Sequence, residues 1–145
     1  MKRKKIRNIV IILVAIGLIA GLATGFYLYN KPPEDVAGMK PEYTLSAGEL
    51  TEAFNTDEKE ANDKYAGKVI QVSGEIAEIE GSDSTMTFIL TAENDPGSGV
   101  SCTLAPEGLE KAKGYSIGEL VALKGKCTGK LFEVVMINCH FVNNE

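Results

Sequence analysis

The sequence predicts an all-β barrel of five strands with flanking helices, carried on a single N-terminal transmembrane helix. Three observations support this fold class. Residues 9–29 form an apolar run without a charge. Beyond residue 67 the apolar residues recur mainly with a period of two, which is typical of strands. The segments GKVIQVSG (67–74) and GELVALKG (118–125) repeat the same interval between glycines, which indicates two strands of related geometry.

The N-terminus has the composition of a membrane anchor. Five of the 15 Lys and Arg residues precede residue 8, and no Asp or Glu does. A helix over residues 9–29 would be about 31 Å long, close to the thickness of the hydrocarbon core of a bilayer. Residues 1–8 are therefore predicted to be a cytoplasmic basic tip and residues 9–29 a transmembrane anchor in the cell membrane, with the rest of the chain outside. A cleaved signal peptide is the alternative, but its apolar region would normally be shorter.

Three glycines in the apolar run form one candidate contact face. Gly17, Gly21 and Gly25 give two overlapping G-x-x-x-G steps, a spacing that lets two membrane helices approach closely. This predicts a homodimer through the transmembrane helix. The alternative is that the glycines have no such role, because glycine is frequent in membrane segments in general.

A linker and a helix precede the predicted barrel. Residues 30–44 contain three prolines and little to bury, which predicts an extended stalk linker. The folded domain is then expected over residues 45–145. It begins with an amphipathic helix, because Ser46 and Glu49 have the spacing of a capping box. Residues 55–57 interrupt the helical pattern and predict a break.

Period-two segments after this helix predict five strands, with one helix between the third and the fourth. The predicted strands are 69–79, 85–91, 100–104, 119–129 and 131–142, with a loop at 92–99 and the helix starting at Pro106. This β-β-β-α-β-β order is that of the OB-fold barrel. The two glycine segments then lie in strands one and four, which are neighbours when the barrel closes. Gly74 and Gly125 are expected where these strands bend and a side chain would clash.

Three stretches carry a resemblance to a known family. They are GKVIQVSGEI (67–76), GVSCTLAPE (99–107) and GKCTGKLFEVVMINC (125–139). They resemble the tRNA_anti-like family, and the resemblance covers roughly residues 45–142. It implies an OB-fold, often found in bacteria behind a membrane or lipoprotein anchor. It implies no particular substrate or reaction, because one fold hosts many functions.

The charge distribution disfavours nucleic acid as the partner. Residues 69–110, which cover the first three predicted strands, contain eight Asp and Glu residues and no Lys or Arg. A surface without cations gains nothing from counterion release and repels phosphates. The lysines at 111, 113, 124, 126 and 130 are interpreted as a solvated face. The expected function is therefore a membrane-anchored extracytoplasmic OB-fold binding module with a protein or peptide partner. Single-stranded nucleic acid or a cell-envelope oligosaccharide is the alternative.

An enzyme is the least supported class. His140 is the only histidine, and no cluster of carboxylates or thiolates surrounds it in the sequence; the adjacent Cys139 is expected to point to the opposite face of the strand. No nucleophile–base pair is recognisable, so we expect no catalytic residue, no metal and no cofactor. The sequence identifies no ligand-binding residue.

The three cysteines are all expected to point toward the core. Cys139, for example, alternates with Val135 and Ile137 in the last predicted strand. They could be small core residues, or two of them could form a disulfide outside the cytoplasm. A tight turn near residue 129 would place Cys127 opposite residue 132, far from Cys139. Strands three and five are neighbours in the barrel, so the expected disulfide joins Cys102 and Cys139 and leaves Cys127 as a free thiol.

Overall fold

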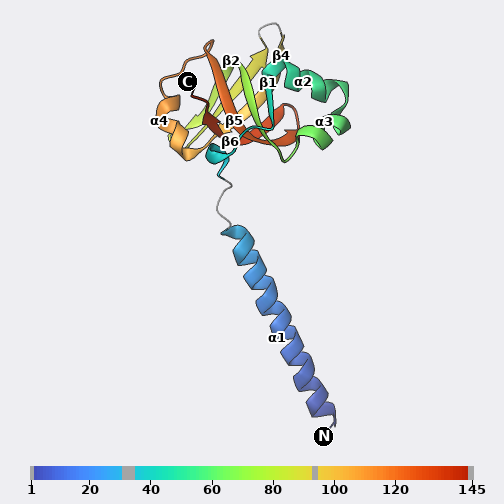
Figure 1. Cartoon of the computed structure of the whole chain (residues 1–145). Helices are drawn as coiled ribbons and strands as arrows, with labels where there is room; N and C mark the ends of the chain where they lie inside the picture. Colours follow the sequence, from blue (N-terminus) through green and yellow to red (C-terminus); the bar gives the residue numbers. More distant parts are fainter. Residues whose placement is uncertain (1, 31–34, 93–94, 144–145) are drawn as a thin grey trace. The chain divides into compact units, whose positions relative to one another are not determined.

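The computed structural model describes residues 2–30, 35–92 and 95–143 (Figure 1). The chain divides into two compact units, Met1–Glu34 and Asp35–Glu145. The first contains one helix, α1 (Lys2–Tyr29), whose side chains are all exposed. By length and composition α1 could cross a membrane or serve as a signal anchor.

The second unit is a closed barrel of five strands, as predicted. Its strands are β2 (Val69–Ser82), β3 (Thr85–Ala92), β4 (Asp95–Leu104), β5 (Leu120–Lys130) and β6 (Val134–Phe141). A short 3₁₀ turn, η2 (Pro106–Gly108), and helix α4 (Leu109–Ala112) connect β4 to β5. The barrel strands follow the order β2-β3-β4-β6-β5, and antiparallel pairing of β2 with β5 closes the barrel. β4 and β6 are parallel neighbours. This is the topology of the OB-fold.

The strands that carry the two glycine segments are neighbours, which confirms the prediction. In the β2–β5 pair Ile70 lies opposite Gly125, and Gly74 lies opposite Val121. A Cβ atom on Gly74 would be 2.9 Å from the Cβ of Ala47 and 3.0 Å from the carbonyl oxygen of Thr91. Glycine is required there because another element passes directly over the strand.

The predicted linker differs from the structure in its second half. A 3₁₀ turn, η1 (Val36–Gly38), packs on the barrel and buries Val36 completely. The ammonium of Lys124 on β5 donates to the carbonyl oxygens of Ala37 and Met39, at 2.9 and 2.7 Å. A further strand, β1 (Tyr43–Ser46), pairs in parallel with β2. β4 also begins inside the predicted loop 92–99.

Two short helices precede the barrel, separated at the predicted break. α2 (Ala47–Thr56) begins with the predicted capping box: Ser46 Oγ accepts from the Glu49 backbone N–H, and Glu49 Oε2 accepts from the Ser46 N–H. Asp57 ends α2 and caps α3 (Glu58–Tyr65) by accepting from the Glu60 N–H at 3.0 Å. The chain turns at Asp57, and the two helices therefore meet at an angle.

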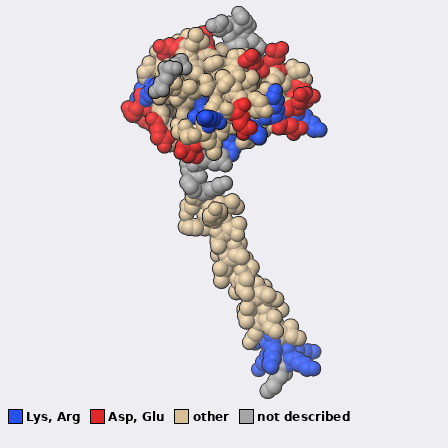
Figure 2. Space-filling model, viewed as in Figure 1, with Lys and Arg blue, Asp and Glu red and all other residues tan. Residues whose placement is uncertain are grey.

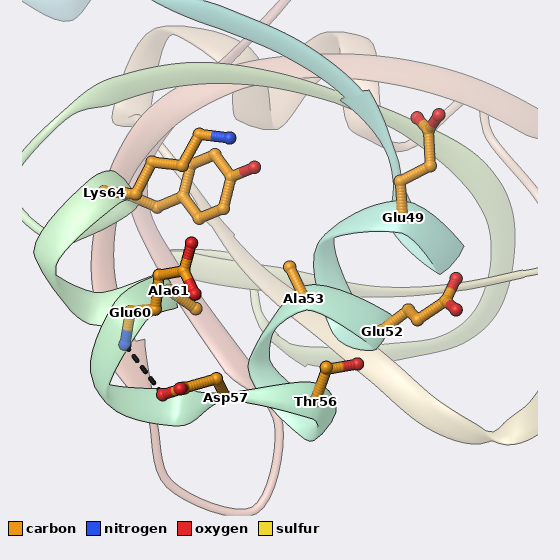
Figure 3. A pocket seen from close by; sticks show the side chains of 9 residues that line it. Glu49, Glu52, Ala53, Thr56, Asp57, Glu60, Ala61 and Lys64 are labelled. Carbon is orange, nitrogen blue, oxygen red and sulfur yellow. Dashed lines mark hydrogen bonds between the residues drawn. The ribbon is translucent and has the colours of Figure 1, made fainter.

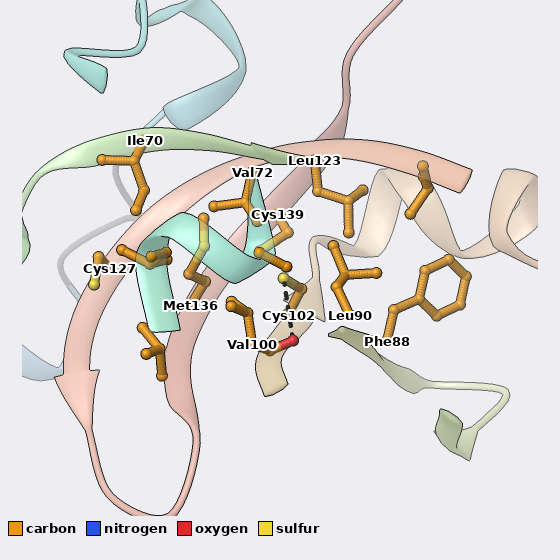
Figure 4. Close-up of a cluster of buried hydrophobic side chains, with 14 of the residues drawn as sticks. Ile70, Val72, Phe88, Leu90, Val100, Cys102, Leu123, Cys127, Met136 and Cys139 are labelled. Atoms are coloured by element: carbon orange, nitrogen blue, oxygen red, sulfur yellow. Dashed lines mark hydrogen bonds between the residues drawn. The ribbon is translucent and has the colours of Figure 1, made fainter. Parts of the chain in front are cut away.

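The barrel core contains apolar side chains from every strand of the barrel, with all three cysteines among them (Figure 4). Phe88 and Leu90 are fully buried on β3, as predicted. The inward residues of β6 differ from the prediction: Val134 and Met136 are buried, whereas Ile137 is 37% exposed. The pairing of β6 is irregular on both sides next to Asn138, which has a φ of 51°. This bulge shifts the alternation by one residue and returns Cys139 to the core.

Candidate binding surfaces

The outer face of β3 and β4 carries neutral side chains. Thr87 and Ile89 on β3 and Ser101 and Thr103 on β4 are half-buried there. The hydroxyl groups of Thr87 and Thr103 lie 3.2 Å apart across the strands. This face therefore offers hydrogen-bonding groups and one aliphatic side chain, with no charge on these four residues.

Three carboxylates border this face. Glu78 and Glu80 are exposed on β2, and Glu133 is half-buried immediately before β6. The pKa of the Glu133 carboxyl is raised, first by its burial and then by the negative charges of Glu80 and Glu78. Like charges gathered in this way favour a cation, and they repel a phosphate.

The turn between β5 and β6 projects two apolar side chains into solvent. Leu131 is 84% exposed and Phe132 is 100% exposed. A backbone hydrogen bond of 3.1 Å from the Leu131 N–H to the Glu133 carbonyl oxygen closes this turn. We refer to Leu131 and Phe132 as the apolar tip.

A groove separates α2 from α3 (Figure 3). Ala53 and Ala61 form its floor, and the small size of these residues creates the space. Carboxylates stand along both walls. The full lining is Glu49, Glu52, Ala53, Thr56, Asp57, Glu60, Ala61, Lys64 and Tyr65. We call it the α2–α3 groove.

One cation already lies at the end of the α2–α3 groove. The Lys64 ammonium is 5.4 Å from the ring centroid of Tyr43 and 5.1 Å from that of Tyr65. Its interaction with Tyr65 raises the pKa of Lys64. Cation–π contacts of this kind hold the ammonium at the two rings, and the negative charge of Glu60 also favours it there.

The five lysines of the predicted solvated face each have an interaction partner in the structure. Lys111 donates to Asn143, Lys113 pairs with Glu110, and Lys124 binds the 35–39 segment. Lys130 donates to Asn55 of α2, and Lys126 also has an interaction partner. In Figure 2 one group of basic residues lies at the N-terminal end of α1, while the barrel unit shows both basic and acidic residues on the face in view.

All three cysteines are buried free thiols. Across the β4–β6 pair Cys102 lies opposite Met136, and Cys139 lies opposite Leu104. Cys102 and Cys139 are therefore close neighbours on adjacent strands, offset by the irregularity in this pair. The predicted disulfide between them stays a prediction.

The thiols nevertheless influence one another. Interaction with Cys139, together with burial, raises the pKa of Cys102 well above its usual value. The expected strand register of Cys127 was wrong. Cys127 lies opposite Met136 and not opposite residue 132, because β5 continues to Lys130 and pairs there with Val134. Burial raises the pKa of Cys127.

Among the described residues, no group of three His, Cys, Asp or Glu side chains could hold a metal ion. On α1, no atom lies within 4 Å of a Cβ placed on Gly17, Gly21 or Gly25. The three glycines therefore stay a predicted dimer face. The α2–α3 groove was missed by the sequence reading, although Glu49, Glu52, Ala53 and Thr56 do have the spacing of one helical face.

The fold and these surfaces define an OB-fold domain attached to an apolar helix. The tRNA_anti-like family matches residues 1–141, which include the helix as well as the barrel. The chain therefore belongs to the tRNA_anti-like family. No curated protein matches it at a significant level.

Solved structures resemble the barrel at low sequence identity. A candidate nucleic acid-binding lipoprotein from Klebsiella pneumoniae subsp. pneumoniae is 18% identical, with a TM-score of 0.57, and the match covers 78% of this chain and 100% of that one. OBody AM3L09, bound to hen egg-white lysozyme, is 17% identical with a TM-score of 0.44, covering 57% and 88%. The asparaginyl-tRNA synthetase of Entamoeba histolytica is 16% identical with a TM-score of 0.41, covering 55% and 21%. At 18% identity the likeness to the Klebsiella lipoprotein supports the fold alone.

Proposed function

We propose that this protein is a membrane-anchored binding module that holds its OB barrel outside the cytoplasm and binds a protein or a peptide. The observation that carries the proposal is the acidic border of the outer barrel face, where Glu133 lies with Glu78 and Glu80. These carboxylates can pair with cationic groups of a polypeptide or accept hydrogen bonds from its neutral groups. They would repel a phosphate backbone.

The basic N-terminal end of α1 supports the proposed orientation. Lysine and arginine next to an apolar helix favour the cytoplasmic side. The family match covers residues 1–141 and so includes the helix. The barrel would then be tethered close to the outer surface of the membrane.

Single-stranded nucleic acid is the second candidate, favoured by the name of the Klebsiella lipoprotein. OB-folds that bind single strands do so with cations along the backbone and aromatic rings under the bases. A cell-envelope oligosaccharide is the remaining alternative, since OB-folds also bind sugars. The chain contains no Trp to stack on a sugar ring. We propose no catalytic activity.

The test uses the full chain in nanodiscs of zwitterionic lipid. A labelled single-stranded oligonucleotide of about 20 residues is titrated at several salt concentrations. We expect no saturable binding at about 150 mM salt, whereas photo-crosslinking from Ser101 in native membranes should trap a polypeptide. Oligonucleotide binding that weakens steeply with salt would show that the second candidate is correct.

A further inference from the structure

We propose that the α2–α3 groove and the apolar tip together form a docking surface for a basic, partly apolar segment of a partner protein. This inference rests on the proposed function and names the chemistry of the partner. The two features come from different parts of the chain, and neither belongs to the outer face of β3 and β4.

The groove is shaped to take a long cationic side chain. Ala53 and Ala61 offer an apolar floor for the methylene groups of a lysine or arginine. Glu52 and Glu60 stand on opposite walls, so a guanidinium or ammonium between them meets a carboxylate on either side (Figure 3). Both side chains are exposed, and they do not participate in the capping bonds made by Glu49 and Asp57.

The Lys64 ammonium indicates that the α2–α3 groove prefers a cation. It lies over the rings of Tyr43 and Tyr65 at the end of the groove, where the protein itself supplies a cation. The walls carry four carboxylates, from Glu49, Glu52, Asp57 and Glu60. Lys64 balances only one of these charges, so the groove keeps a net negative charge that a basic partner complements.

The apolar tip is attached beside the same helices. Lys130, directly before the tip, donates to Asn55 on α2. At Gly129 a Cβ atom would lie 2.9 Å from the side-chain oxygen of Asn62 on α3. The turn that carries Leu131 and Phe132 is therefore fixed against the helix pair. The ring of Phe132 is fully exposed, and aromatic rings of this kind become central anchors when a partner covers them.

The two features together specify the partner segment. It must place a lysine or an arginine in the groove and an apolar side chain against Phe132. Nucleic acid lacks the cation, and a purely basic peptide lacks the apolar contact.

Two synthetic peptides test this surface on the full chain in nanodiscs of zwitterionic lipid. One alternates arginine with leucine, and the matched peptide alternates arginine with serine. Glu60→Lys should weaken both peptides about tenfold, because it reverses a charge on the groove wall. Glu58→Lys is the matched control: Glu58 is exposed in the same first turn of α3 but does not line the groove, so the change should be less than about twofold.

The apolar contact has its own pair of variants. Phe132→Ser should weaken the arginine–leucine peptide about tenfold and leave the arginine–serine peptide unchanged. Ile117→Ser, which alters a different exposed apolar residue, should affect neither peptide. Circular dichroism of each variant confirms that the barrel is folded.

Several outcomes would overturn the inference. Equal effects of Glu60→Lys and Glu58→Lys would mean that only overall charge matters. Equal binding of the two peptides would remove the role of the apolar tip. A homodimer that Phe132→Ser dissociates would identify a second copy of this chain as the occupant. If a polypeptide crosslinks from Ser101 but not from Thr56 in the groove, the proposed function stands and this docking surface is wrong. If the oligonucleotide binds and the peptides do not, the proposed function itself fails.

Discussion

Gly125 on β5 lies directly against Cys139 on β6. A Cβ atom on Gly125 would be 2.5 Å from the Sγ of Cys139 and 2.9 Å from the carbonyl oxygen of Ile137. The backbone of β5 therefore approaches β6 at the bulge more closely than any side chain permits. This contact explains why the second glycine segment ends in glycine, and it leads to the first prediction.

Gly125→Ala should destabilise the barrel by about 1–3 kcal/mol, because the added methyl group forces the two strands apart. Urea unfolding of the full chain measures the change. In the double variant Gly125→Ala/Cys139→Ala the nearest clashing atom, the Sγ of Cys139, is gone. Cys139→Ala should therefore cost less stability when Gly125→Ala is already present than it does in the parent protein. Gly114→Ala is the control, because its Cβ would be no closer than 3.5 Å to any atom. A neutral Gly125→Ala would contradict the close approach.

The stability of the barrel should depend on pH through Glu133. The pKa of its carboxyl is raised above the usual 4.5 by burial and by Glu80 and Glu78. Between the unfolded and the folded pKa the folded state binds more protons, so this group's contribution to stability decreases as pH rises through that interval. Glu133→Gln should therefore raise the urea midpoint at about pH 7 and change it little at about pH 4. The exposed Glu107→Gln serves as the control, and a shift of equal size at both pH values would contradict the prediction.

The three cysteine thiols should be protected from alkylation in the folded protein. Cys102, Cys127 and Cys139 are buried, and the raised pKa values of Cys102 and Cys127 keep these two thiols protonated. Alkylation of reduced, folded protein should therefore be slow for all three and fast in urea, as read by mass spectrometry. Rapid labelling without urea would show that the barrel opens readily.

The disulfide between Cys102 and Cys139 stays a separate prediction for protein taken from cells. A non-reducing peptide map of protein unfolded in urea in the presence of the alkylating reagent should recover these two cysteines linked and Cys127 alkylated. If the bond forms, reduction should lower the urea midpoint. Three alkylated cysteines would show that the disulfide does not form in cells.

The orientation of the anchor can be measured on intact cells. With a membrane-impermeant thiol reagent, Lys40→Cys should react and Arg3→Cys should not, because the basic tip is predicted to be cytoplasmic. Permeabilised cells provide the control in which both sites react. The opposite labelling pattern would reverse the topology, and an N-terminus found near residue 24 would indicate a cleaved signal peptide.

Association through α1 is the last prediction. Gly21→Ile places a large side chain in the middle of the face formed by Gly17, Gly21 and Gly25, so it should weaken a membrane dimer strongly. Leu18→Ile, in the same helix, is the matched control. Crosslinking in native membranes measures the dimer, and equal crosslinking of both variants would mean that the glycines are not the contact.

Some features could be read from short stretches of sequence because they depend on nearby residues. The capping box needs only Ser46 and Glu49, three positions apart, and the break at Asp57 needs only its own cap. The alternation in β3 identifies Phe88 as a core residue, because side chains along a strand point to opposite faces. The two glycine intervals identified β2 and β5 as related strands, because a Cβ atom on Gly74 or Gly125 would clash with another part of the chain.

What only the tertiary structure decided depends on partners distant in the chain. Tyr43–Ser46 is too short to be recognised as a strand, and it becomes one because β2 offers it hydrogen bonds. The bulge at Asn138 changes which side chains of β6 face inward, so the sequence assigned Cys139 inward with the wrong neighbours. The α2–α3 groove exists because Ala53 and Ala61 meet where the chain turns at Asp57. The sequence by itself therefore determined the apolar N-terminal helix, the barrel and its acidic character, which follow from local pattern and composition. Register and concave surfaces depend on how separate segments pack, and they were decided only by the folded chain.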